Sequence, residues 1–419
     1  MARVFSTFAG FMFFVLETSA APPTFHEDIL PIFQRSCQTC HRPDSVAPMS
    51  LTTYKEVRPW AKSILLKVLD RSMPPFGAEA PKGFYLYDTR LSQEEIDLIV
   101  EWIGNKCPQG KFGVKTKEPD LPKSQWDLGE PDIVTHILKN VNLTNDNANV
   151  WRFVFFDYVF ERDTWIEAVQ VLPDAGSAIH HLNTFYMDPG FQVPEELEIL
   201  GNAHPKQSNG LSLWTAGRPP LRCPDETAML IPAGARIGAN VHFAPTADSS
   251  EEGLSIAIYL KNGTVNSRFR RYAINAPYDT IRIPPGESEH TVTRTMALSR
   301  KDLLVHDFTG HMHYRGKSLH VEFETPTGEK SVPFSIPRFD FYWQQTYELS
   351  KSLLVQGGTK ATMTGVFDNS SSNDANPDSG RWVEGGVRSV DEMLQVYLNC
   401  TDPAEHLGLT VKNGLVIEQ

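Results

Sequence analysis

Six side chains in the C-terminal two thirds of the sequence have the chemistry of soft-metal ligands. They are His180, His181, His242, His311, His313 and Met393. Imidazole nitrogen and thioether sulfur are ligands that suit soft and borderline metal ions. A single histidine in a β-rich protein is more often structural, so the prediction of a metal site depends on the whole set. His306 and His320 lie at odd offsets from the pair at 311 and 313, and we interpret them as structural or supporting residues.

The spacing within this set puts conditions on the backbone. His311 and His313 are two residues apart, so on an extended strand both imidazoles leave the same face. His180 and His181 are adjacent and would point to opposite faces of a regular strand. They can share one metal ion only if the strand bulges or bends, and the Gly-Ser pair at 176–177 makes a bend plausible.

A second kind of centre is predicted by the motif CQTCH, which contains Cys37, Cys40 and His41. This is the C-x-x-C-H pattern of c-type haem attachment. Two thiols one turn apart each form a thioether with the porphyrin edge, and the next imidazole reaches the iron. Met73 in RSMPPF is the predicted second axial ligand, and Met49 is the alternative. The sequence therefore predicts one covalently attached haem c.

Helices are expected around this motif. Amphipathic periodicity predicts helical segments at about 26–36, 54–71 and 92–105, and the last begins with a capping box formed by Ser92 and Glu95. The stretch from FHEDILPIF to RSMPPF resembles the cytochrome modules at the N-termini of exported bacterial redox proteins. That resemblance implies a small all-α domain that encloses the haem.

The remainder of the chain is predicted to be β-rich. Short runs such as WRFVFFDYVF, TWIEAVQVL and LSIAIYL are punctuated by Pro, Gly and Asn, which favours sandwiches or barrels. We therefore expect a multidomain protein in which a small all-α cytochrome c domain is followed by two all-β, jelly-roll-like sandwiches. The expected parts are a signal peptide at 1–21, the haem domain at 22–112, a linker at 113–130, and sandwiches at 131–275 and 276–419.

The order His-His, lone His, His-x-His and Met resembles the copper type II, ascorbate-dependent monooxygenases, the family of peptidylglycine α-hydroxylating monooxygenase and dopamine β-monooxygenase. The resemblance covers roughly residues 130–400. It implies a first copper ion in the first sandwich, held by His180, His181 and His242. In this family that copper accepts electrons and passes them on.

The same resemblance implies a second copper ion in the second sandwich, held by His311, His313 and Met393. In the family this copper binds and activates dioxygen, and the two ions face each other across a solvent-filled cleft. Tyr397 matches a tyrosine that the family places near the substrate, so it joins the predicted catalytic residues.

Two positions depart from the peptide-amidating members of the family. Those enzymes have an arginine where this chain has Thr309, and an asparagine where it has Gln395. Both differences speak against a glycine-extended peptide as the substrate. Arg315, just after the His-x-His motif, is a candidate anion partner whose orientation the sequence does not give.

Composition and the N-terminus restrict partners and location. The formal charge of −12 argues against nucleic acid or an anionic membrane surface as the main partner. Residues 1–21 have the layout of a cleaved secretory signal, and no other stretch has the length of a membrane span, so a periplasmic or secreted location is expected. Beyond the haem cysteines, Cys223 and Cys400 could form a disulfide bond and leave Cys107 free, but the pairing stays open.

The function that these expectations imply is that of an exported haem–copper monooxygenase. It would hydroxylate a C–H bond of a small-molecule or peptide substrate with dioxygen. Electrons from ascorbate or a redox protein would pass from the haem to the three-histidine copper and then to the His2Met copper. The first alternative is an electron-transfer or copper-binding protein without monooxygenase activity. The second is a pair of sugar- or peptide-binding sandwiches tethered to a cytochrome.

Overall fold

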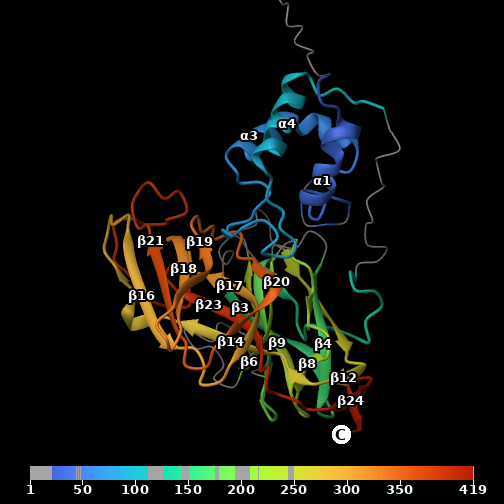
Figure 1. The fold of residues 1–419 in the computed structure, drawn as a ribbon, viewed down its shortest axis with the longest axis vertical. Helices are drawn as coiled ribbons and strands as arrows, with labels where there is room; N and C mark the ends of the chain where they lie inside the picture. Colours follow the sequence, from blue (N-terminus) through green and yellow to red (C-terminus); the bar gives the residue numbers. More distant parts are fainter. Residues whose placement is uncertain are drawn as a thin grey trace, which may run out of the picture.

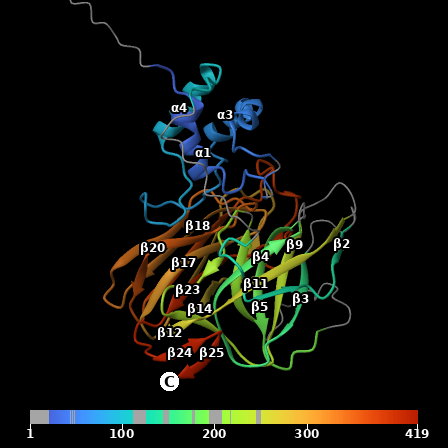
Figure 2. The same cartoon turned by 90° about the vertical axis from the view of Figure 1, so that its right-hand side faces the viewer.

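The computed structural model describes residues 21–43, 45, 47, 49–111, 126–143, 151–174, 179–193, 208–215, 217–243 and 250–418. The predicted signal peptide up to residue 20, and the linker from 113 to 125, lie outside these residues. Figure 1 shows a helical module above two β-sandwiches, and the view from the side in Figure 2 agrees. Within the described ranges, no helix is long and apolar enough to cross a membrane.

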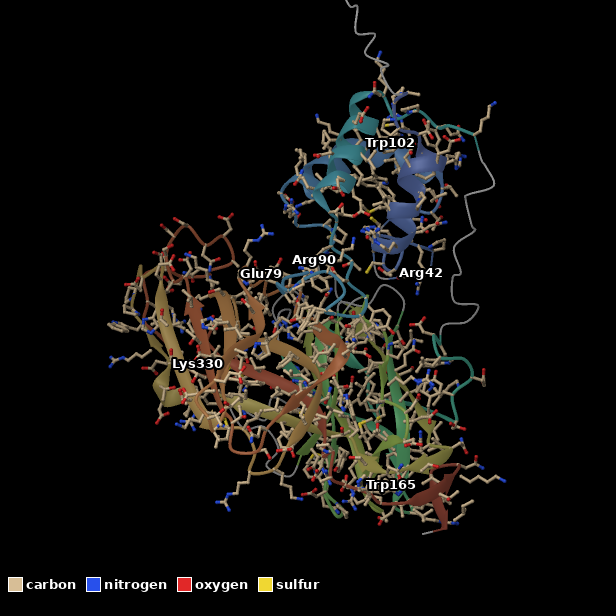
Figure 3. All side chains as sticks on the ribbon, viewed as in Figure 1. Arg42, Glu79, Arg90, Trp102, Trp165 and Lys330 are labelled. Atoms are coloured by element: carbon tan, nitrogen blue, oxygen red, sulfur yellow. The ribbon has the colours of Figure 1, made fainter. Side chains whose placement is uncertain are left out.

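The helical module confirms the three predicted helical segments. Its elements are η1 (Phe25–Ile29), α1 (Leu30–Ser36), α2 (Tyr54–Val57), η2 (Arg58–Trp60), α3 (Ala61–Leu69) and α4 (Gln93–Gly104). The predicted capping box is present at the start of α4, where the Glu95 backbone N–H donates to Ser92 Oγ at 3.2 Å. Trp102, labelled in Figure 3, is fully buried in the core of this module against Phe25.

The first sandwich consists of two facing sheets. One has the order β1 (Ile133–His136), β11 (Leu254–Leu260), β4 (Thr164–Pro173), β8 (Thr227–Ile231) and β13 (Ser267–Arg268), with β7 (Leu221–Arg222) paired to β4. The other has the order β3 (Trp151–Val159), β9 (Arg236–Phe243), β5 (Ile179–Met187) and β6 (Ser208–Thr215). A further pair is β2 (Val141–Leu143) with β10 (Ser250–Glu252). Apolar residues of both sheets, such as Val241 and Ile256, share one core.

The second sandwich repeats this arrangement. One sheet has the order β14 (Arg270–Asn275), β23 (Gln395–Thr401), β17 (Leu303–His311) and β20 (Thr346–Val355). The other has the order β16 (His290–Ala297), β21 (Lys360–Phe367), β18 (Gly316–Glu324) and β19 (Lys330–Ile336). Short elements complete it: η3 (Tyr278–Thr280), β15 (Arg282–Ile283) and β22 (Val383–Glu384). The stacked rings of Phe308 and Phe334, 5.1 Å apart, join the two sheets. A mostly β chain of sandwich architecture with short N-terminal helices is thus confirmed.

The last strands of the chain return to the first sandwich. β24 (Leu409–Lys412) pairs with β25 (Leu415–Glu418) and with β12 (Gly263–Val265), which lies in the sequence between β11 and β13 of the first sandwich. Val411 is buried in one cluster with Trp165. The predicted second sandwich at 276–419 therefore includes residues at its C-terminal end that pack on the first sandwich.

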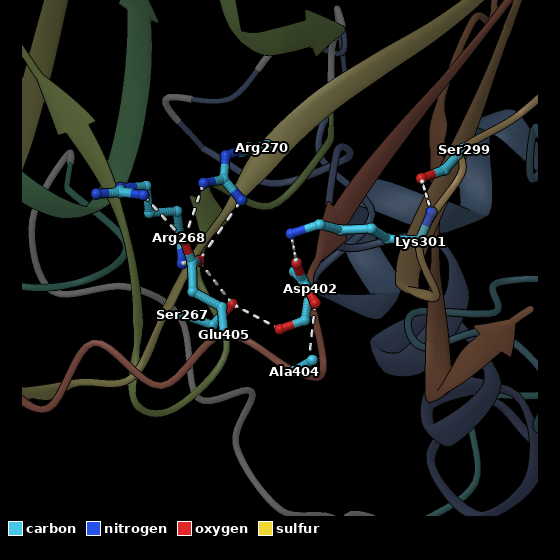
Figure 4. Close-up of polar contacts among 8 residues, drawn as sticks. All are labelled: Ser267, Arg268, Arg270, Ser299, Lys301, Asp402, Ala404 and Glu405. Atoms are coloured by element: carbon cyan, nitrogen blue, oxygen red, sulfur yellow. Dashed lines mark hydrogen bonds and ion pairs between the residues drawn. The ribbon is translucent and has the colours of Figure 1, made fainter. Parts of the chain in front are cut away.

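Charged residues fix this returning tail where the two sandwiches meet. Glu405 forms ion pairs with Arg268 at 2.9 Å and with Arg270 at 3.0 Å, and Lys301 pairs with Asp402 at 3.2 Å (Figure 4). Arg270 begins β14, which pairs with β23, so the second sandwich begins a few residues before the predicted boundary at 275.

Segment 76–90 joins the helical module to the second sandwich. Ala78 and Tyr85 are buried in the core of that sandwich. The Leu86 N–H donates to the carbonyl of Glu348 in β20 at 2.8 Å. The helical module is therefore held by core packing and backbone hydrogen bonds as well as by the covalent chain.

All five cysteines lie in the described part of the chain, and all are free thiols. Cys223 is buried in the core of the first sandwich and Cys400 in the core of the second. Because the two thiols belong to different cores, the structure does not contain the disulfide bond considered for this pair.

Candidate metal centre

Strands β5 and β9 bring three histidines together. His181 pairs with His242 across these strands, and the register is irregular between Ile179 and His181. His180 lies at this irregularity, which resolves the difficulty that adjacent residues of a regular strand face opposite ways. The bulge is thus present where a shared ion requires it, while the Gly-Ser pair at 176–177 lies outside the described residues.

The nitrogen atoms of the three rings converge. His180 Nδ1 lies 3.2 Å from His242 Nδ1 and 3.1 Å from His181 Nδ1, and one nitrogen of each ring lies within 4.8 Å of the others. Metal–nitrogen bonds of about 2 Å place two ligand nitrogens about 3 Å apart. The carbonyl of Tyr342 accepts a hydrogen bond from His180 Nε2–H at 3.1 Å, which leaves the lone pair of that ring on Nδ1. The three histidines therefore form a site that could bind a metal ion.

Burial keeps these imidazoles neutral. His181 and His242 are almost fully buried, and burial is the main reason that the pKa of His242 falls to about 3, with the His180 and His311 rings as further causes. The pKa of His180 is also lowered by burial. A neutral imidazole offers the lone pair that a metal ion needs, so the site does not depend on deprotonation at neutral pH.

The His311–His313 pair lies at the end of β17 and in the turn that follows. The two ring centroids are 5.1 Å apart. His311 Nδ1–H donates to the Gln344 side-chain carbonyl at 2.5 Å, and His313 Nδ1–H donates to the backbone carbonyl of Asp391 at 3.1 Å. Both acceptors are oxygens without a proton, so each neutral ring carries its lone pair on Nε2. Hydrogen bonds of this kind, from the ring nitrogen that does not bind the metal to a protein oxygen, orient histidine ligands of metal ions.

Met393 lies in a segment that is tied to this pair on both sides. Its neighbour Glu392 accepts hydrogen bonds from the backbone N–H of His313 at 2.9 Å and of Arg315 at 2.7 Å. Two residues later, Gln395 pairs with His311 across β23 and β17. Met393 is 8% exposed. The fold therefore brings this methionine, which is distant in the sequence, to the His-x-His motif.

The two groups of histidines lie next to each other. The ring centroids of His181 and His311 are 6.1 Å apart. Phe341 packs against both groups, with its centroid 5.4 Å from that of His242 and 6.4 Å from that of His313. The resemblance implied a solvent-filled cleft between the two sites. The structure instead has one buried histidine cluster in contact with a phenylalanine, because the segment that carries Phe341 fills the space.

Tyr397 lies on the polar face of the β14–β23–β17–β20 sheet. It pairs with Thr309 on one side, and the Arg271 guanidinium lies 4.2 Å from the centroid of its ring. Its hydroxyl donates to the Gln395 side chain. The alternation of β23 puts Gln395 and Tyr397 on the same face as His311 in β17. The predicted substrate residue Tyr397 and His311 therefore share one face of the sheet.

Arg315 is not available to an anion. Its side chain is fully buried, Nε donates to Asn369 Oδ1 at 2.9 Å, and one terminal nitrogen donates to the Val390 carbonyl at 3.0 Å. These bonds fix the loop that precedes Met393, so Arg315 stabilises the backbone next to the second site.

A cavity of about 470 Å³ separates the helical module from the sandwiches. All residues of the predicted haem site line it, namely Cys37, Cys40, His41, Met49 and Met73. Apolar side chains such as Ile64 and Phe76 form much of the wall. The volume falls within the roughly 300–1,000 Å³ typical of ligand and cofactor pockets. The thiols, the imidazole and the apolar wall all suit a covalently attached haem.

The orientation of His41 distinguishes the two candidate methionines. His41 Nδ1–H donates to the backbone carbonyl of Met49 at 3.2 Å, so the lone pair of the ring is on Nε2, at the opposite edge. The Met49 backbone therefore lies behind the predicted proximal ligand, which supports Met73 as the residue on the other side.

Burial raises the pKa of the Cys37 thiol to about 12.

Loops of both sandwiches complete the wall of this cavity. A Cβ atom added at Gly217, whose φ is +75°, would lie 2.1 Å from Cys40 Sγ, so only glycine allows this approach. His306 also lines the cavity and bonds to Ser352 Oγ at 2.8 Å and Thr401 Oγ at 2.9 Å. Its position agrees with its interpretation as a structural residue.

Comparison with known proteins does not assign the chain to a family. No protein-family model and no curated protein matches the chain. Among solved structures, the major capsid protein P2 of bacteriophage PM2 is 8% identical over 68% of this chain and 99% of that one, with a TM-score of 0.28. Peptide-N(4)-(N-acetyl-β-D-glucosaminyl)asparagine amidase is 9% identical over 64% of this chain and 96% of that one, with a TM-score of 0.27. The resemblance to copper monooxygenases stays a prediction.

Several residues that support the centre were not predicted from the sequence. Gln344, Phe341 and the carbonyl of Tyr342 all belong to the run FDFYWQQ, which has no metal-ligand pattern. Its only signal is a density of aromatic residues between two strand-like segments. Glu392, which directly precedes Met393, was not predicted to support the site either.

Replacing Glu392 with alanine is expected to weaken the second site and the fold together. The change leaves the buried N–H groups of His313 and Arg315 without their acceptor, and each such group costs about 1–3 kcal/mol. Chemical denaturation should show a loss of about 2–5 kcal/mol in the free energy of unfolding. Glu392→Gln keeps an amide oxygen as an acceptor and should recover part of the lost free energy of unfolding. An unchanged free energy of unfolding in Glu392→Ala would contradict this role.

Proposed function

We propose that the chain is a haem–copper monooxygenase that inserts one oxygen atom of dioxygen into a substrate C–H bond. The overall reaction is C–H + O2 + 2e⁻ + 2H⁺ → C–OH + H2O. The observation that carries the proposal is the convergence of His180, His181 and His242 beside a second histidine pair with a different protein environment. Two such groups provide for two copper ions with different roles.

The ligand chemistry differs between the two groups. In the first, the Nδ1 atoms of His181 and His242 both lie close to His180 Nδ1, and all three side chains are imidazoles that accommodate both copper oxidation states. In the second, His311 and His313 present Nε2, and Met393 would add a thioether that favours Cu(I). Copper at the second site would supply dioxygen activation, and copper at the first would store one reducing equivalent.

The protein residues around the second site have their own tasks. Gln344 and the Asp391 carbonyl fix the ring orientations, and burial excludes water from the histidines. Tyr397, on the same sheet face as His311, is placed to contact a substrate. Thr309 beside it offers no positive charge for a terminal carboxylate, which supports a substrate other than a glycine-extended peptide.

The helical module is proposed to supply electrons. Haem attached to Cys37 and Cys40, with His41 and Met73 as axial ligands, would accept single electrons from ascorbate or a redox protein. The cavity borders both sandwiches, so the reducing group would be held beside the histidine cluster rather than on a tether.

Metal analysis combined with product analysis tests the proposal. Purified protein loaded with copper is expected to contain two copper ions and one haem iron per chain. When it is reduced with ascorbate and exposed to dioxygen with a panel of small C–H substrates, a product should gain one oxygen atom, measured by mass spectrometry. Met393→Ala should lose this product and keep the three-histidine copper. Zinc or no metal in the β-sandwiches of properly loaded protein would contradict the proposal.

One observation favours the second candidate, a copper-binding electron-transfer protein. Phe341 occupies the space between the two histidine groups, where a substrate would need room. In that case both coppers would cycle between oxidation states, and no substrate of the panel would gain oxygen.

A further inference from the structure

One short segment touches both predicted redox sites. Between β19 and β20 the chain runs through residues 337–345, and we call residues 341–346, which include the first residue of β20, the bridging segment. Trp343 lines the haem cavity, as do residues 345 and 346. Phe341, Tyr342 and Gln344 contact the histidine cluster instead. The segment thus forms the wall between the cavity and the cluster.

On the cluster side, the contact with His180 is direct. The Tyr342 backbone carbonyl accepts the hydrogen bond from His180 Nε2 at 3.1 Å, and the two rings have centroids 5.2 Å apart. His180 Nδ1 faces the other two histidines. This ring therefore connects the proposed copper, through one imidazole and one hydrogen bond, to the bridging segment.

On the cavity side, Trp343 is separated from that carbonyl by a single peptide bond. Its side chain lines the same cavity as Cys40, His41 and Met73. Gln344, 1% exposed, locks the segment in place, since its side-chain nitrogen donates to the Phe341 carbonyl at 3.0 Å while its oxygen accepts from His311. The path from cavity to cluster consists of covalent bonds and one hydrogen bond.

From this geometry we propose that the bridging segment carries single electrons from the haem cavity to the three-histidine copper, with Trp343 as the entry residue. This inference rests on the proposed function. In the step, a ferrous haem becomes ferric and copper(II) becomes copper(I), so one electron is transferred and no bond or proton changes place. Electron tunnelling is faster through bonds and hydrogen bonds than across gaps, and this segment offers a bonded route.

A competing route exists at Gly217, which lies against Cys40 and follows β6, whose Thr215 pairs with His181. The two routes predict different effects of substitution. Removing the Trp343 indole breaks only the route through the bridging segment, because Gly217 belongs to the first sandwich.

The test uses full-length protein carrying haem and copper(II), without dioxygen or substrate. The haem is reduced rapidly, and its reoxidation by copper is followed by absorbance while the loss of the copper(II) signal is followed by electron paramagnetic resonance. Trp343→Leu should slow both changes by an order of magnitude or more, with unchanged metal content and haem midpoint potential. Trp343→Phe, which keeps an aromatic ring, should restore much of the rate.

Trp382→Leu is the matched control, because this half-exposed tryptophan of the second sandwich stacks on Arg282 and does not line the cavity. It should leave the rate unchanged. An unaltered rate in Trp343→Leu would overturn the inference and point to Gly217, while the proposed function would stand. Absence of copper or haem in the wild-type protein would instead overturn the proposed function.

Discussion

Protein carrying His242→Ala is expected to lose the copper of the first site. His242 Nδ1 lies 3.2 Å from His180 Nδ1, and its removal leaves two imidazoles where three converge. Loss of residues that merely orient ligands costs 10–100-fold in metal affinity, so loss of a ligand should cost more than about 100-fold. Copper titration against a chelator of known affinity, followed by elemental analysis, measures the effect.

The second copper and the fold should survive this substitution. His320→Ala is the control, since this partly exposed histidine of β18 is not one of the cluster residues, and it should retain both ions. Retention of both copper ions with wild-type affinity in His242→Ala would show that the three histidines do not form the first site.

The double variant Cys37→Ala, Cys40→Ala is expected to lose all covalently attached haem. Cys37 and Cys40 line the cavity with His41, and no other cysteine does so. Denaturing electrophoresis followed by a haem stain distinguishes covalent from dissociable haem. The wild-type chain should stain, and the double variant should not.

Each single cysteine variant should keep haem through one thioether with a shifted absorbance spectrum. Cys223→Ala, in the core of the first sandwich, is the control and should stain like the wild type. Equal staining of the double variant would show that haem, if present, is bound in some other way.

Motif order and spacing were enough to predict which three histidines converge in the first sandwich. His181 and His242 face each other because of the register in which β5 pairs with β9. The spacing of residues along the sequence does not determine this register. The need for a bulge near His180 could be stated in advance, because adjacent residues of a regular strand point opposite ways. Its position at residue 180 required the structure.

What the sequence did not predict depends on segments without a pattern of their own. Phe341 packs against both histidine groups, and a phenylalanine between strands carries no signal of that role. The helical segments were predictable because their 3.6-residue periodicity is local. The return of β24 to β12 was not, because an edge pairing between strands about 145 residues apart follows from exposed backbone groups rather than from side-chain type.

Segment 76–90 has a consequence for how such a protein could arise. A cytochrome joined by a flexible tether can be gained, lost or exchanged by recombination, because neither partner relies on the other for its core. Here Ala78 and Tyr85 belong to the core of the second sandwich, and the Leu86 backbone extends its hydrogen bonding. An exchanged helical module would have to bring these contacts with it, so the module and the second sandwich are not independently replaceable parts.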